Sequence, residues 1–207
     1  MNSVRLQNPH RIEYIDALRG FTMILVVFTH VEIFSFMKSY ASFIYEIIVS
    51  FYMPLFFFIS GFMANKEVWN AKIWLRMCGK KMRALLVPTL IFGIVYSFTY
   101  LKVDFVSFVT NDYKLGYWFT IVLCEMFILV YTMNFALYHL NHKNLNSRKV
   151  IVMMFISILL YLVRLIPGYL SSYSRVYSIL VLHFTSLYFP FFAFGYICSM
   201  YKDIFNK

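Results

Sequence analysis

Charged residues are scarce in this sequence. Of its 207 residues only 14% are charged, whereas 61% are hydrophobic and 21% are aromatic. A typical soluble domain is about 25% charged and about 45–50% apolar. The composition therefore excludes an ordinary soluble domain, and it also excludes a disordered chain. A bilayer-spanning helix needs about 20 apolar residues. The length therefore leaves room for six or seven crossings and for no separate water-soluble catalytic domain.

Cysteine and acidic residues are also few. Cys78, Cys124 and Cys198 form neither a CxxC motif nor a metal-ligand spacing with histidine, so we expect buried thiols, no disulfide framework and no metal site. Lys and Arg number 19 against 9 Asp and Glu, which gives a net charge of +10. In a soluble protein this excess would suggest nucleic acid as a partner. In a membrane protein it is typical of cytoplasmic loops, so no nucleic-acid partner is expected.

Six apolar runs are long enough to cross a bilayer. Because backbone amides in hydrocarbon must be satisfied within their own segment, these runs should be helices. The sequence therefore predicts an all-α membrane bundle, a single domain over residues 1–207. The predicted spans are 17–37, 43–63, 84–101, 117–138, 150–166 and 179–200.

Lysine and arginine fall unevenly between the loops. The two termini and the loops after the second and fourth spans together carry 14 of them, and the remaining segments carry 5. Positive residues accumulate on the cytoplasmic side of membrane proteins. Both termini are therefore predicted to be cytoplasmic, in agreement with an even number of spans.

The first span contains the most informative polar residues. Arg19 and His30 are eleven residues apart, so on a helix they share one face, about 16 Å apart along the axis. Asp16 precedes Arg19 by three residues and lies near the same face. An ionisable group at the depth of His30 is costly and usually meets a cavity or a partner. A functional histidine and a histidine satisfied by a neighbouring helix are both compatible with this pattern, and the shared face with Arg19 favours function.

Two further groups of charged residues are candidates for binding. A basic stripe at helical spacing precedes the third span and consists of Lys72, Arg76, Lys80 and Arg83. With the apolar line beside it, the stripe is typical of an interfacial amphipathic helix. It would attract anionic lipid or hold a phosphorylated substrate. Glu125, inside the fourth span, is a candidate to meet His30 at similar depth. The pair Ser60-Gly61 in the second span predicts close approach of another backbone.

With these residues in place, the chain resembles the membrane acyltransferase 3 family. The resemblance rests on YIDALRGFTMILVVFTH at 14–30, an arginine and a histidine separated by ten residues, followed by MPLFFFISGF at 53–62 and the basic entry to the third span. GYWFTIVLCEMF at 116–127 and YFPFFAFGYI at 188–197 resemble later landmarks. Members usually carry about ten spans, so this chain is expected to be a short or truncated member.

The resemblance implies a function in the bacterial cytoplasmic (inner) membrane. It implies transfer of an acyl group, in many relatives acetyl, from cytoplasmic acyl-CoA to a hydroxyl of an envelope sugar, glycan or lipid-linked sugar, with no permanently bound cofactor. Arg19 and His30 would be the functional pair, and Lys80 and Arg83 would match the second basic motif. His30 would either take the proton of the acceptor hydroxyl or accept the acyl group transiently. Arg19 and the basic stripe would hold the CoA phosphates.

Other classes of function remain open. His30, Glu32 and Glu125 would also suit a proton or ion pathway. The last three spans do not repeat the first three, which argues against a transporter built from repeats. An inactive remnant and a non-catalytic membrane subunit are further alternatives, and thioester cleavage separates an enzyme from all of them.

Overall fold

The computed structural model describes residues 13–36, 43–66, 70–101, 105–111, 114–140, 145–165 and 178–201. Within these ranges the chain is helical and contains no strand. The long helices are α1 (Glu13–Phe36), α2 (Phe43–Phe62), α3 (Ala71–Tyr96), α5 (Trp118–Leu140), α6 (Leu145–Leu165) and α8 (Leu182–Met200). The short elements are the π-helix η1 (Ser97–Leu101), α4 (Phe105–Thr110) and the 3-10 turn η2 (Lys114–Gly116). The predicted all-α class is thus confirmed in the described part of the chain.

Four of the helices are long and apolar enough to cross a membrane. They cover Glu13–Val31, Ala71–Thr99, Trp118–Leu140 and Leu145–Arg164. At the second predicted span the side chains that the structure describes form the shorter apolar stretch Glu46–Phe62, within the 20-residue helix α2. The helix at the sixth predicted span, α8, has 19 residues and carries several polar side chains that pack inside the protein. Met37 and Ile166, the predicted ends of two spans, lie outside the described residues. The prediction of six spans therefore stays a prediction for two of them.

The third predicted span is part of a much longer helix. We expected a span over 84–101, with the basic stripe on an interfacial amphipathic helix at its entry. Instead α3 runs without a break from Ala71 to Tyr96 and continues into η1. It begins at Asn70, whose side-chain oxygen accepts a hydrogen bond from the Lys72 backbone amide at 2.9 Å. The apolar side of the early turns packs on α5, where Trp74 donates its indole hydrogen to Thr132 at 3.1 Å. Part of the apolar line beside the basic stripe therefore packs on another helix, and the interfacial position of the stripe stays a prediction.

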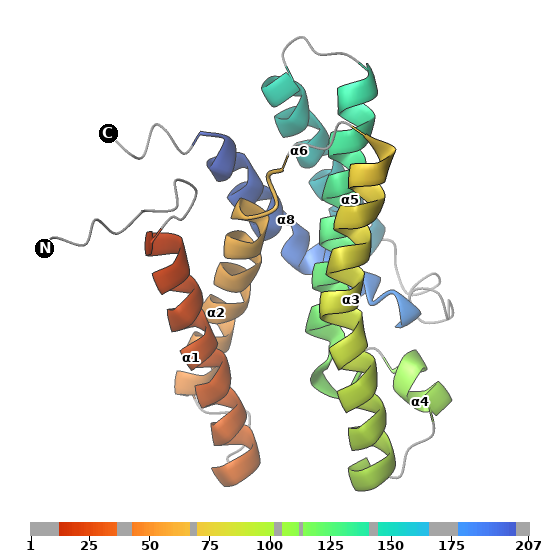
Figure 1. Cartoon of the computed structure of the whole chain (residues 1–207). Helices are drawn as coiled ribbons and strands as arrows, with labels where there is room; N and C mark the ends of the chain where they lie inside the picture. Colours follow the sequence, from red (N-terminus) through yellow and green to blue (C-terminus); the bar gives the residue numbers. More distant parts are fainter. Residues whose placement is uncertain are drawn as a thin grey trace, which may run out of the picture.

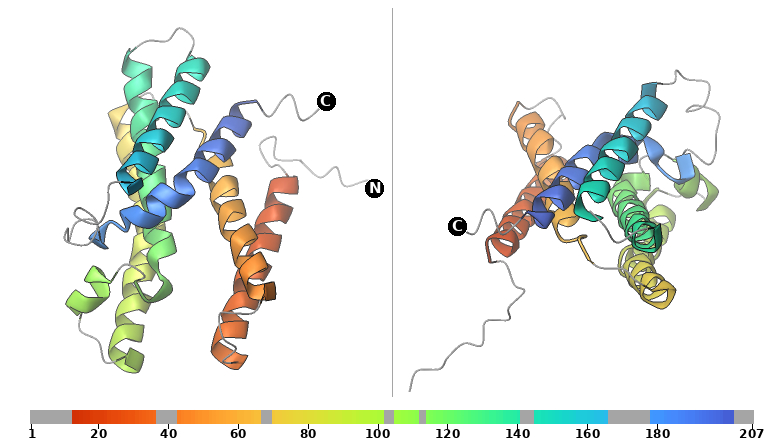
Figure 2. Two further views of the ribbon diagram at one scale, coloured as in Figure 1. Left: turned by 180° about the vertical axis from the view of Figure 1, so that it is seen from behind. Right: turned by 90° about the horizontal axis from the view of Figure 1, so that it is seen from above.

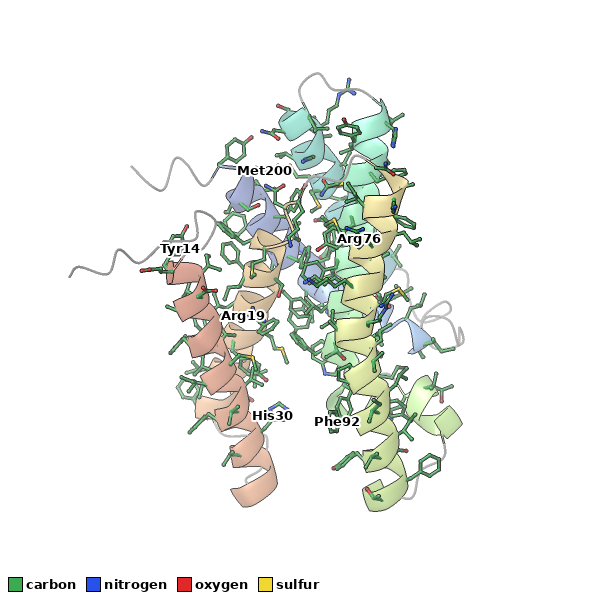
Figure 3. The ribbon with its side chains drawn as sticks, viewed as in Figure 1. Tyr14, Arg19, His30, Arg76, Phe92 and Met200 are labelled. Atoms are coloured by element: carbon green, nitrogen blue, oxygen red, sulfur yellow. The ribbon has the colours of Figure 1, made fainter. Side chains whose placement is uncertain are left out.

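The long helices form two groups joined by α8. Figures 1 and 2 show α1 beside α2 on one side of the molecule, and α3, α5 and α6 on the other. α8 runs obliquely between the groups and packs on α2, α6 and α5. α3 packs on α5, and the main partner of α1 is α2. Tyr14 near the start of α1 and Met200 at the end of α8 lie toward the same end of the bundle (Figure 3).

The burial pattern suits a membrane and places α5 at the centre. About half of the α5 span, 56%, is buried, whereas the spans of α1, α3 and α6 are only 11–17% buried. Large apolar side chains such as Ile24, Ile91 and Phe155 are more than half exposed on these three helices. In water such surfaces would be unstable, whereas in a bilayer they meet lipid chains.

Two glycines allow α2 and α8 to cross with their backbones in contact. A Cβ atom on Gly61 would lie 1.9 Å from the Phe192 carbonyl oxygen, and one on Gly195 would lie 1.9 Å from the Phe58 carbonyl oxygen. The prediction that Ser60-Gly61 admits another backbone is confirmed. The close crossing lets the rings of Phe57 and Tyr188 stack beside it, with centroids 4.8 Å apart.

Candidate functional site

Arg19 and His30 lie on the part of α1 that is not used for packing. The seam with α2 is formed by Ile15, Thr22 and Thr29, which are almost completely buried and recur every seven residues. Arg19 and His30 are both exposed. Because α1 is unbroken, the two residues keep the predicted helical separation of about 16 Å. The His30 side chain lies on the side of α1 that faces α3, and Arg19 lies nearer the start of the helix (Figure 3).

Local hydrogen bonds fix the environment of His30. Its Nδ1 atom lies 2.8 Å from the Val26 carbonyl oxygen, one turn earlier. In the tautomer that donates from Nδ1 to this carbonyl, Nε2 keeps a lone pair that can accept a proton. The neighbouring Thr29 points into the α2 seam, where it forms a hydrogen bond with the buried Tyr52. This bond fixes the rotation of α1 and therefore the direction of the His30 ring. Asp16, the third candidate on α1, is half-buried.

The basic stripe lies on the outer face of α3. All four of its side chains, those of Lys72, Arg76, Lys80 and Arg83, are exposed. The opposite face of the helix carries Trp74 and the buried Cys78, which pack into the core formed around α5. Arg76 and Arg19 lie toward the same end of the bundle, whereas His30 and Phe92 lie toward the other end (Figure 3). The cationic residues and the histidine therefore occupy different levels of the molecule.

Lys81 is the cation of α3 that points inward. It is half-buried, and its ammonium nitrogen lies 3.5 Å from the centre of the Phe127 ring of α5. Arg19 from α1, Lys66 from the end of α2 and Lys80 all act electrostatically on this ammonium group. Lys81 was not among the residues that the sequence predicts to bind a ligand. Lys80 and Lys81 look alike in sequence, and only the position of α5 decides which of them faces the interior.

A buried pair of side chains holds Lys66 in this region. Tyr196 of α8 donates its hydroxyl hydrogen to the Asn134 side-chain oxygen of α5 at 2.6 Å. The Asn134 side-chain nitrogen donates in turn to the Lys66 backbone oxygen at 3.2 Å. Both side chains are almost fully buried. The backbone after α2 is therefore attached to α5 and α8.

Glu125 belongs to a separate polar cluster between α5 and α8. Its Oε2 atom accepts a hydrogen bond from the Thr185 hydroxyl at 2.7 Å, and its Oε1 atom is buried without a hydrogen-bond partner in the described structure. The ammonium group of Lys114 is the charge that acts on it. Lys114 is itself buried and donates to the backbone oxygens of Val109 and Ser178. The polar groups that engage Glu125 are thus Thr185 and Lys114, and the expected meeting with His30 is not among its contacts.

The described residues contain no group of three His, Cys, Asp or Glu side chains that could hold a metal ion. The cations around Lys81 would instead suit an anionic ligand.

Comparison with protein families decides the affiliation of the chain. The family model described as an acyltransferase domain, acyltransferase 3, matches residues 12–207. The chain belongs to the membrane acyltransferase 3 family. No curated protein and no solved structure shows a significant match.

Family membership covers the elements that carry the candidate site. The matched range includes α1 with Arg19 and His30, α3 with the basic stripe, and α5 with Glu125. The structure leaves Arg19 of α1 and the basic stripe of α3 exposed on two helices that have no extensive packing with each other. It does not bring Arg76 or Arg83 to the inner side of α3, and it leaves Glu125 in a cluster of its own.

Proposed function

We propose that this protein is a membrane O-acyltransferase that transfers an acyl group from cytoplasmic acyl-CoA to a hydroxyl of a cell-envelope sugar or glycan. The observation that carries the proposal is that Arg19 and His30 are both exposed on the unbroken helix α1, with His30 about three turns further along it. A donor with phosphates at one end and a thioester at the end of a long arm matches this separation. Family membership supports acyl transfer as the class of reaction.

The donor would be bound at the end of the bundle where α1 begins. Guanidinium and ammonium groups form charge-assisted hydrogen bonds with phosphate oxygens. Arg19, Lys80 and Arg83 are the proposed contacts, with Arg76 further along α3 and Asp16 beside Arg19. The pantetheine arm would then extend along α1 toward His30.

His30 would act as a general base in the transfer step. The neutral ring accepts the proton of the acceptor hydroxyl while the hydroxyl oxygen attacks the thioester carbonyl carbon. The new carbon–oxygen bond forms as the carbon–sulfur bond breaks, and the thiolate of CoA takes up the proton from His30. The exposed position of His30 supports this role, because a base must reach the hydroxyl of a separate acceptor. We propose that Glu125 affects acceptor binding without touching the acceptor, because its hydrogen bond with Thr185 holds α5 and α8 together.

The acceptor and the membrane follow from the same proposal. An acceptor that is a lipid-linked sugar or an envelope glycan would meet the enzyme at the bacterial cytoplasmic membrane. The apolar outer surfaces of α1, α3 and α6 support integral insertion with membrane lipid around them.

The test is thioester cleavage and acyl transfer by the purified protein in a bilayer. The variant His30→Ala should lose about 10²–10⁴-fold in turnover, the range typical of a general base. His183→Ala is the matched control, since His183 is an exposed histidine on α8 and is expected to keep normal turnover. Near-normal turnover in a folded His30→Ala protein would overturn the role of His30. A folded wild-type chain that cleaves no thioester would instead favour the non-catalytic subunit.

A further inference from the structure

Two strained backbone positions meet at one carbonyl group. Of the non-glycine residues in the described ranges, only Lys114 and Val181 have positive φ angles, 45° and 51°. Such angles are uncommon for any residue with a side chain and are outliers for a β-branched one. The Ser178 carbonyl oxygen accepts a hydrogen bond from the Lys114 ammonium group at 2.8 Å and another from the Val181 backbone amide at 3.3 Å. Residues 64 positions apart in the sequence are thus joined at the turn before α8.

Lys114 is held at this junction by bonds to several segments. Its side chain is almost completely buried, and its ammonium group also donates to the Val109 carbonyl oxygen in α4. Its backbone amide donates to the Asn111 carbonyl at 3.1 Å, and its own carbonyl accepts from the Tyr117 amide at 3.0 Å. A buried charge is costly unless its hydrogen bonds are made. One lysine therefore connects α4, the segment that enters α5 and the turn that enters α8.

The first turns of α8 are fixed to α5 by two further contacts. The Phe184 ring stacks on Trp118 of α5, with ring centroids 4.2 Å apart. The Thr185 hydroxyl donates to the Glu125 carboxylate of α5 at 2.7 Å. Val181, which occupies the capping position of α8, supplies no side-chain cap. The start of the helix is therefore held by contacts with other segments and not by a cap of its own.

Strain that is held by contacts favours a second position once a contact is lost. A residue in a sparsely populated backbone conformation persists only where the surrounding structure holds it there. Loss of the bond between Lys114 and Ser178 removes a contact that holds both strained positions. Because α8 packs on α2, α5 and α6, a movement of its first turns reaches both groups of helices.

We propose that Lys114 and the Ser178 carbonyl form a latch that holds the start of α8 in a strained position against α5, and that the start of α8 has a second, released position. In the released position the ammonium group leaves Ser178, Val181 returns to a negative φ, and the first turns of α8 move away from α5. The latch is a conformational switch of the fold, and it does not depend on the proposed function.

The experiment measures backbone hydrogen exchange of the whole chain in bilayer nanodiscs. The reporters are the Phe184 and Thr185 amides, which both donate to the Val181 carbonyl, at 3.0 and 3.3 Å. Lys114→Met removes the donor and keeps an unbranched side chain, so it should speed exchange at these amides about tenfold or more. Exchange in α6 should change less than about twofold. Lys72→Met is the matched control and should change neither, since Lys72 is an exposed lysine on α3.

A second pair of variants tests the strain itself and does not need Lys114→Met to fold. Val181→Ala and Val181→Gly both remove the buried valine side chain, but only glycine adopts a positive φ without strain. Exchange at Phe184 and Thr185 should therefore be about threefold or more slower in Val181→Gly than in Val181→Ala. Equal or faster exchange in Val181→Gly would overturn the latch. A folded Lys114→Met protein with unchanged exchange at the start of α8, or with an equal increase in α6, would overturn it as well.

Discussion

Gly61 and Gly195 lie where the backbones of α2 and α8 come closest. A methyl group on Gly61 would meet the Phe192 carbonyl oxygen at 1.9 Å, and a backbone oxygen cannot move away as a flexible side chain does. We therefore expect Gly61→Ala to lower the free energy of unfolding by about 3 kcal/mol or more, at the upper end of overpacking effects. The measurement is the thermal unfolding midpoint of the purified protein in detergent.

Gly79 provides the matched control for that substitution. It also lies inside a helix, and a Cβ atom there would meet nothing within 4 Å. Alanine is a better helix former than glycine, so Gly79→Ala should be neutral or stabilising by up to about 1 kcal/mol. Equal midpoints for the two variants would show that the backbones of α2 and α8 are further apart than described.

The Glu125 carboxylate depends on a single hydroxyl. Thr185 donates the hydrogen bond that Oε2 accepts at 2.7 Å, while Oε1 is buried without one in the described structure. Thr185→Val keeps the shape and removes the donor, so we expect a loss of about 1–3 kcal/mol in stability. Thr185→Ser should restore most of it. Thr99→Val is the control, because the Thr99 hydroxyl is exposed and bonds only one turn back, to Val95. A thermal unfolding midpoint of Thr185→Val equal to that of the wild-type protein would contradict the hydrogen bond between Thr185 and Glu125.

Several of these side-chain contacts could not be predicted from the sequence. The pair Ser60-Gly61 could be recognised because small residues in a span have a general meaning, and the crossing confirmed it. Lys81 could not be distinguished from Lys80, since that requires knowing which side of α3 meets α5. The contact between Glu125 and Thr185 joins residues that are 60 positions apart. No local pattern contains such a pair.

At the scale of the element, α3 differs most from its expected form. Its first turns contain Lys72, Arg76 and Lys80, which lower the local hydropathy. These turns are therefore not part of the apolar run from which the third span was predicted. Hydropathy reports where a helix enters lipid, whereas the helix itself needs only its backbone hydrogen bonds and a cap at Asn70. Helices α1, α5 and α6 were predicted to within about five residues, because their apolar runs nearly coincide with their helical lengths.

The basic stripe on α3 leads to a prediction about donor binding. If the stripe only attracts anionic lipid, its four members should have similar effects on affinity. If Arg83 contacts the donor phosphates as proposed, Arg83→Lys should weaken acyl-CoA binding about threefold to tenfold, because a bidentate contact is lost while the charge stays. Lys72→Gln, at the far end of the stripe, should have almost no effect. Both are measured by acyl-CoA titration in one fixed lipid composition. If Arg83→Lys leaves the affinity for acyl-CoA unchanged, the function of the stripe would be attraction of anionic lipid instead.

At the scale of the whole molecule, the ends of the described structure agree with an even number of crossings. The start of α1 and the end of α8 lie toward the same end of the bundle (Figure 3). The charge distribution predicts that this end is cytoplasmic, with 14 Lys and Arg on that side against 5 on the other.

Reporter fusions test this orientation. A reporter joined after Lys207 should be active only when it is of the type that works in the cytoplasm. A fusion after Tyr113, in the segment between α4 and η2, serves as the opposite control and should be active only outside. Periplasmic activity after Lys207 would overturn the orientation, whichever helices cross the membrane.

The close crossing of α2 and α8 also sets the distance between the two groups of helices. α1 packs chiefly on α2, and α8 connects α2 to α5 and α6. Any side chain at Gly61 or Gly195 would separate the two backbones, and it would therefore move α1, with Arg19 and His30, relative to α3 and α5. The two glycines thus determine the position of the candidate residues on α1 as well as the local packing of two helices.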